Sequence, residues 1–303
     1  MDAIVLAGGI PNPEDPLYSF LKGDAKALVD VAGKPMIQWV VDALSGAKHV
    51  SNIIIVGLSP KNKLKSRKPL HYLSNQGRLL SNIVAGVDKS LELNKKNKYV
   101  MVVSSDIPTL KPEMVDWLVD TTMETNDDLY YGVCPKKVME KRFPGANRTY
   151  IHLKDMDICG ADINVVHVDM ANKKYLDVWE SLIVKRKNPV AQAMAMGWLT
   201  SFLYLTRQLT LADSVRRVCE RINIKGRAII WSHAEPCMDV DKPHQLELLR
   251  KDLAKQQKKT VKTKSVKSKT TKTVKKKTTG SAKVKPSKAA KPKTKPKAKS
   301  KKK

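Results

Sequence analysis

Cysteine is scarce in this chain of 303 residues, and its four cysteines form no metal-binding or disulfide pattern. They are isolated, with no C-x-x-C pair, which argues against a zinc site and a disulfide framework and fits a reducing cytosol. The most apolar later stretch, from Ala191 to Leu205, contains polar residues and is too short to span a bilayer. No basic segment followed by an apolar run marks a signal peptide. We therefore expect a cytoplasmic protein without a transmembrane segment.

Acidic and aromatic residues are both absent from residue 255 to residue 303. This segment holds 22 of the 57 Lys and Arg residues, and thus most of the net charge of +28. Its few sizeable apolar side chains cannot offset the entropy of ordering, so we expect a disordered tail. Its composition is similar to that of linker-histone arms. The lysines predict non-specific nucleic-acid binding, and hence nucleoid association, although anionic membranes and polyphosphate are equal alternatives in charge.

Residues 1–254 carry a modest charge and are long enough for one sizeable α/β domain. Short apolar runs alternate with longer segments of helical periodicity. This order predicts a Rossmann-like, mostly parallel sheet with helices on both faces. The expected strands are 3–7, 52–57, 99–104, 129–133, 162–168 and 228–231. The expected helices are 36–44, 77–91, 112–123, 183–208, 213–222 and 243–255.

The first expected strand ends in two glycines, in the segment Leu6-Ala7-Gly8-Gly9. Glycines allow a sharp turn and a close approach of backbone N–H groups to a ligand, so this loop is a candidate phosphate site. A plain turn would have the same pattern. The Walker spacing G-x-x-x-x-G-K-[ST] is absent, but Lys26 follows the loop and would balance phosphate charge.

Three aspartates are candidates for binding a cation. Asp106 directly follows the expected strand 99–104, at the sheet edge where the glycines lie, and a carboxylate there suits Mg²⁺. Asp239 and Asp241 stand two residues apart, so they share a face if the chain is extended. The alternative for Asp106 is an Asx turn or a cap of the next helix, and Asp241 would equally cap the helix that begins near residue 243.

These segments together resemble the nucleotidyltransferase superfamily of molybdenum cofactor guanylyltransferases and sugar-phosphate nucleotidyltransferases. The resemblance rests on four motifs in order over residues 1–250: the glycine loop 6–9, the stretch from 26–28 to 32–37, Asp-Ile-Pro at 106–108, and Asp-Val-Asp-Lys-Pro at 239–243. It implies a glycosyltransferase-A-like fold. It also implies that Leu6, Ala7, Gly8 and Gly9 wrap an NTP.

The resemblance further implies a role for each candidate charge. Lys26 would contact the phosphates of the NTP, and Asp106 and Asp241, with Asp239 beside them, would hold Mg²⁺. Relatives carry an Arg in the loop after the glycines, but residues 10–25 contain none. Lys22 is the nearby cation that would take its place, as a point charge rather than a planar fork. Gln76 and Gly77 lie where relatives read the base; Gly77 would otherwise simply precede a helix.

The middle of the chain contains the candidates for binding the acceptor. Arg142 and Arg148 would clamp an acceptor phosphate, and Asp162 and Asn164 would bind sugar hydroxyls. A solvated basic loop is the alternative. The sequence thus predicts a Mg²⁺-dependent enzyme that moves an NMP from an NTP to a phosphorylated acceptor, such as a sugar phosphate, and releases pyrophosphate. The competing hypothesis is a catalytically degenerate nucleotide-binding domain whose Lys-rich tail binds nucleic acid.

Overall fold

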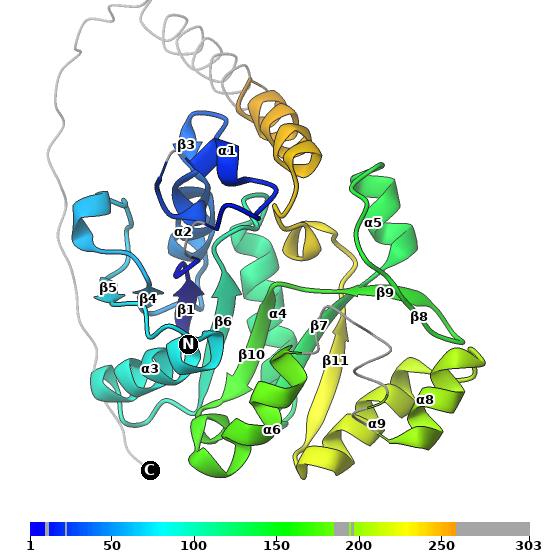
Figure 1. Cartoon of the computed structure of the whole chain (residues 1–303). Helices are drawn as coiled ribbons and strands as arrows, with labels where there is room; N and C mark the ends of the chain where they lie inside the picture. The colour runs from blue at the N-terminus through cyan, green and yellow to red at the C-terminus, as the bar shows by residue number, and fades with distance from the viewer. Residues whose placement is uncertain (10–11, 22, 185–193, 195–196, 259–303) are drawn as a thin grey trace, which may run out of the picture. The chain divides into compact units, whose positions relative to one another are not determined.

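A nine-stranded sheet is the centre of the protein (Figure 1). The structure is a computed structural model that describes residues 1–9, 12–21, 23–184, 194 and 197–258. Eight strands follow the order β5-β4-β1-β6-β10-β7-β9-β8, and β11 pairs with β7. The strands are β1 (Asp2–Leu6), β4 (Ile53–Val56), β5 (Leu70–Leu73), β6 (Tyr99–Ser104), β7 (Leu129–Pro135), β8 (Ile151–His152), β9 (Asp157–Gly160), β10 (Ile163–His167) and β11 (Gly226–Ile230). A separate hairpin joins β2 (Asp30–Val31) to β3 (Lys34–Pro35).

Strands β5, β4, β1 and β6 are parallel, and β10 runs antiparallel between β6 and β7. The mostly parallel, Rossmann-like sheet predicted from the sequence is therefore confirmed. Helices surround it: α1 (Tyr18–Leu21), α2 (Met36–Gly46), α3 (Leu79–Leu93), α4 (Pro112–Met123), α5 (Lys136–Arg142), α6 (Lys173–Val184), α8 (Trp198–Leu205), α9 (Leu211–Ile222) and a last helix that begins at residue 243.

The two faces of the sheet are packed against different helices (Figure 1). Ala3 and Val5 of β1 belong to a large core that includes residues of α2 and α4, whereas Ile4 packs with Val87 of α3 in a smaller core. This split follows from strand geometry, because successive side chains point to opposite faces. The first turn of α4 contains Pro112, whose fixed φ suits the start of a helix.

One predicted helix, 183–208, is wrong where the structure describes it. Helix α6 begins ten residues earlier, at Lys173, and α8 is a separate helix. Gly197 precedes α8 with φ of 105°, a backbone conformation that a continuous helix cannot contain. Residues 185–193 and 195–196 lie outside the described residues. Strand β5 had no counterpart in the prediction, because the polar edge segment around it shows no apolar run.

The chain divides into two units, Met1–Lys255 and Gln256–Lys303. The structure describes only residues 256–258 of the second unit, so the predicted tail lies almost wholly outside the described residues. Among the residues that are described, no helix is both long and apolar enough to cross a membrane.

Candidate active site

The carboxyl ends of three parallel strands meet at one edge of the sheet. Leu6 of β1 is in register with Val56 of β4 on one side and with Ser104 of β6 on the other. The segments that follow these strands are therefore neighbours, and they contain the glycine loop, Gly57 and Asp106. Ligands of open α/β sheets bind outside this edge, which makes it the first place to look for a site.

The glycine loop is packed so tightly that its backbone position is fixed. A Cβ atom on Gly57, whose φ is 105°, would lie 2.3 Å from Cα of Gly8. On the other side, Nδ2 of Asn75 donates a hydrogen bond of 2.8 Å to the carbonyl oxygen of Gly8. The loop thus lies between two fixed neighbours, which agrees with a rigid phosphate-binding turn.

Replacing Gly57 by Ala should therefore cost far more stability than the same change at Gly33. Both glycines have positive φ, but nothing lies within 4 Å of the position of a Cβ on Gly33. The Gly33→Ala variant should lose about 1 kcal/mol of unfolding free energy from backbone strain alone. The Gly57→Ala variant should lose about 3 kcal/mol, because the methyl group also displaces the glycine loop. Urea unfolding measures both losses, and equal values would contradict the close packing.

Three predicted catalytic residues converge beside this loop. Nζ of Lys26 is 2.8 Å from Oδ2 of Asp106 and 2.7 Å from Oδ1 of Asp241. Lys26 begins a 3₁₀ turn, Lys26–Leu28, Asp106 follows β6, and Asp241 precedes the last helix. The two carboxylates lie 80 and 215 residues from the lysine in sequence, so the fold alone brings them together.

The surroundings of this cluster hold its charges in place. Oγ of Ser104 donates a 2.6 Å hydrogen bond to Oδ1 of Asp106, and the backbone N–H of Asp241 donates to Oε1 of Gln245. Burial works to lower the pKa of Lys26, but the two carboxylates outweigh burial and raise that pKa above its usual value. Lys26 is therefore a fixed positive charge at neutral pH.

The third predicted metal ligand, Asp239, is paired with a different residue, Arg148. Its carboxylate pairs with Nη1 of Arg148, whose side chain is only 13% exposed. Among the described residues, no group of three or more His, Cys, Asp or Glu side chains is placed to hold a metal ion. Of the three predicted metal ligands, Asp106 and Asp241 thus face each other, with Nζ of Lys26 between them.

Two of the four predicted acceptor residues lie beside the cluster of Lys26, Asp106 and Asp241. Arg148 is 3.6 Å from Asp162 through Nη2 and Oδ2, and Asp106 is close enough to influence Asp162. Burial and the charge of Asp106 raise the pKa of Asp162 to about 7, although Arg148 opposes the shift. Within the described structure, neither Nε of Arg148 nor Oδ2 of Asp162 has a hydrogen-bond partner.

The other two acceptor candidates have clear contacts within the protein. Arg142 pairs with Glu235 at 2.8 Å and binds both carboxylate oxygens of Asp252, so it ties α5 to the last helix. Asn164 accepts a 2.8 Å hydrogen bond from the backbone N–H of Gly132 and bridges β10 to β7. Their roles in acceptor binding stay predictions.

The predicted base-reading turn is shaped by two asparagines: Asn75, within the predicted segment, and Asn82, which the sequence did not indicate. Gln76 donates its backbone N–H to Oδ1 of Asn82, and Gly77 donates its own to Oδ1 of Asn75. Since Asn75 also holds Gly8, this turn and the glycine loop form one unit. Asn75, two residues before Gly77, is a typical turn residue, whereas Asn82 lies within α3 and has no local signal of its own. Lys22, the predicted substitute for the loop arginine, lies outside the described residues.

The sequence pattern of the MobA-like NTP transferase domain matches residues 3–222 of this chain. The chain belongs to this family. The match confirms the resemblance seen in the sequence. It includes the glycine loop, Lys26 and Asp106, whereas Asp239 and Asp241 lie beyond it. The site therefore combines family residues with a carboxylate from the segment that leads into the last helix.

Relatives within this family carry names of the same kind. A probable molybdenum cofactor guanylyltransferase of Thermococcus sibiricus is 31% identical over 126 residues, 42% of this chain and 58% of the relative. One of Pyrococcus furiosus is 33% identical over 116 residues, 38% of this chain and 52% of the relative. The chain thus spans about half the length of these curated relatives.

Solved structures extend the likeness over most of the chain. A hypothetical transferase from Thermus thermophilus is 27% identical with a TM-score of 0.68, and the alignment covers 81% of this chain and 99% of that one. A CMP:2-keto-3-deoxy-manno-octonic acid synthetase complexed with CTP has a TM-score of 0.51 at 13% identity, covering 84% of this chain and 100% of that one. The second similarity shows a shared fold.

Proposed function

We propose that this protein transfers a nucleotidyl group from an NTP to a phosphate-bearing acceptor and releases pyrophosphate. This function rests on the convergence of Lys26, Asp106 and Asp241 beside the glycine loop. Membership of the NTP transferase family supports it, as do relatives named guanylyltransferases. An anionic substrate fits a glycine loop next to a lysine whose side chain is only 19% exposed.

The two converging carboxylates fit a divalent cation. They are hard oxygen ligands aimed at one position, where the ammonium group of Lys26 already sits between them. Mg²⁺ is typically bound by one or two carboxylates together with substrate phosphates and water. When bound, it would neutralise negative charge on the reacting phosphate. We assign Asp106 and Asp241 to the metal, and Asp239 to the positioning of Arg148.

The residues of this chain have separate tasks in the reaction. The acceptor phosphate is already an anion, so no general base is needed, and positioning and charge neutralisation carry the catalysis. The glycine loop would hold the NTP phosphates through backbone N–H groups. Lys26 would stabilise the charge that grows on the transferred phosphate, and Arg148 with Asp162 would orient the acceptor. Gln76 and Gly77 would lie against the base.

The position of a radioactive label in the products tests this function. With an NTP labelled at the α-phosphate, the label should move to the acceptor, and a label at the γ-phosphate should appear in pyrophosphate. Four NTPs should be tested against several phosphate monoesters, including sugar phosphates, because neither base nor acceptor follows from the site. Release of γ-labelled orthophosphate would mean hydrolysis and would contradict nucleotidyl transfer.

For the tail, we propose non-specific binding to nucleic acid. Each lysine that neutralises a phosphate releases a counterion, so binding should weaken steeply with salt. A chain that ends at Lys255 should no longer be retained by DNA at about 0.15 M salt, whereas the full chain should be retained. Retention by both proteins would place the binding surface on residues 1–255. Loss of retention together with an absence of nucleotidyl transfer would instead favour the degenerate binding domain.

A further inference from the structure

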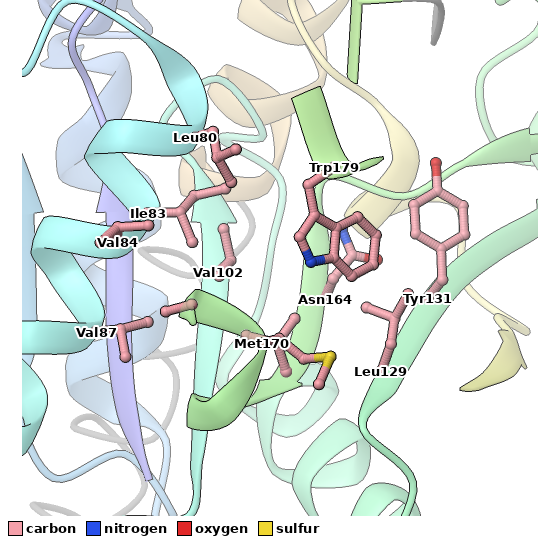
Figure 2. A pocket seen from close by; sticks show the side chains of 12 residues that line it. Leu80, Ile83, Val84, Val87, Val102, Leu129, Tyr131, Asn164, Met170 and Trp179 are labelled. Carbon is pink, nitrogen blue, oxygen red and sulfur yellow. The ribbon is translucent and has the colours of Figure 1, made fainter. Parts of the chain in front are cut away.

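An apolar cavity of about 170 Å³ lies on one face of the sheet, beneath α3 and α6 (Figure 2). Ile83 and Val87 of α3 form one wall, and Val102 of β6 forms part of the floor. Met170, from the short turn after β10, and Trp179 of α6 close the opposite side. A cavity of this size in a protein core accepts a molecule such as benzene.

The floor of the cavity is sheet surface that the neighbouring helices leave uncovered. Val102 belongs to a central strand between β1 and β10, yet it remains only partly buried, whereas Val103, on the other face, is fully buried. Val166 of β10 is also partly buried, next to a fully buried Val165. Sheets of this class normally have both faces covered. In the part of the chain that the structure describes, this face therefore has room for a further group.

The cavity begins close to the catalytic cluster. Val102 and Ser104 point to the same face of β6, two residues apart, and Ser104 is hydrogen-bonded to Asp106. Asn164 lines the cavity and is paired with Val102 across the sheet. Asp162 lies two residues before Asn164 in the sequence and is beside Arg148. Two strand residues span about 7 Å. A group attached to a phosphate at Arg148 would reach the cavity directly.

The chemistry of the walls selects the kind of group that fits. The lining is almost entirely hydrocarbon, and the amide of Asn164 is already bonded to Gly132 and to the carbonyl of Ala161. Sugar hydroxyls placed here would lose their hydrogen bonds to water without replacement, which is costly. An alkyl or aryl group would instead gain by leaving water.

We propose that the acceptor is a phosphate monoester whose alcohol carries an apolar group of about six carbon atoms, which occupies this cavity. The identification of the ligand as the acceptor rests on the proposed nucleotidyl transfer. The cavity itself stands on its own geometry. Its occupant would set the acceptor specificity, because the phosphate end is held at Arg148 and the apolar end beneath α3.

Binding of a series of alkyl phosphates to the full chain tests this site. By calorimetry, affinity should rise about threefold to fourfold for each methylene from methyl to hexyl phosphate and then level off. Attraction of the phosphate to the Lys-rich tail is common to the whole series, so it does not alter this slope. Equal affinity for methyl and hexyl phosphate would overturn the inference.

Variants of the lining residues should change in opposite directions how affinity depends on alkyl chain length. Val84→Phe, on α3, should fill the cavity and remove the chain-length dependence, whereas Leu80→Ala should extend it to longer chains. Glu92→Phe, at an exposed position of the same helix, is the matched control and should leave it unchanged. If affinity still rises with alkyl chain length in the Val84→Phe variant, the alkyl group binds to another apolar surface. That result would also overturn the inference.

The outcome separates the cavity from the reaction. If hexyl phosphate is preferred but no NTP releases pyrophosphate with any acceptor, the proposed function fails and the apolar site stands. If pyrophosphate is released with compact acceptors and alkyl chains bring no gain in affinity, nucleotidyl transfer stands and the apolar site fails. When both are correct, the preference for hexyl phosphate should appear in kcat/KM as well.

Discussion

Replacing Asp106 by Asn should lower the rate of pyrophosphate release by at least about 100-fold. Asn keeps the shape of the side chain and its contact with Ser104, but it removes the negative charge that faces Lys26 and Asp241. The cation position would then have one carboxylate instead of two. Initial rates at saturating NTP and acceptor, followed across Mg²⁺ concentrations, measure the loss. Both the rate and the apparent Mg²⁺ affinity should fall.

The matched control is Asp42→Asn, which also removes the partner of a lysine. Asp42 pairs with Lys34 at 2.6 Å, but both side chains are about 40% exposed. Exposed pairs contribute about 0.2–1 kcal/mol, and this one is not part of the catalytic cluster, so its loss should leave the rate within about twofold. If Asp106→Asn behaves like this control, Asp106 is not a metal ligand and the proposed mechanism is wrong.

The convergence of Lys26, Asp106 and Asp241 was predicted from local signals together with family motifs. An apolar run marks β1 before the glycines, another marks β6 before Asp106, and a proline marks the helix after Asp241. Once the strands are parallel and adjacent, residues that follow them must meet at one edge. The position of Asp106 therefore followed from the order of the strands, whereas Lys26 and Asp241, which do not directly follow a strand of the sheet, were predicted from the family resemblance.

Arg142 shows why the acceptor side was less predictable. The sequence displays a cation, but it does not display the partners of that cation. Glu235 and Asp252 lie 93 and 110 residues away, and only the packing of α5 against the end of the domain brings them to Arg142. The cavity has the same origin. Val102 and Val103 are equally apolar in the sequence, and only the positions of α3 and α6 decide which one stays accessible.

Replacing Lys26 by Ala should lower both the unfolding free energy and the reaction rate, and Mg²⁺ should restore only the unfolding free energy. Without Mg²⁺, the variant should lose about 1–3 kcal/mol of unfolding free energy, because Asp106 and Asp241 are left facing each other without a cation. With Mg²⁺, most of this loss should be recovered, since the metal no longer competes with the ammonium group for the carboxylates. The stabilisation by Mg²⁺ should therefore be larger in the variant than in the wild type.

Mg²⁺ should not restore the reaction rate of the Lys26→Ala variant, although it restores the stability. Lys26 has a second task at the NTP phosphates, which Mg²⁺ between the carboxylates does not perform, so the rate should stay at least about 100-fold lower at any metal concentration. Thermal unfolding with and without Mg²⁺, together with pyrophosphate release, separates the two effects. Lys34→Ala, from the exposed pair with Asp42, is the control and should change neither. If Mg²⁺ stabilises the Lys26→Ala variant no more than it stabilises the wild type, the metal and the lysine do not share these carboxylates.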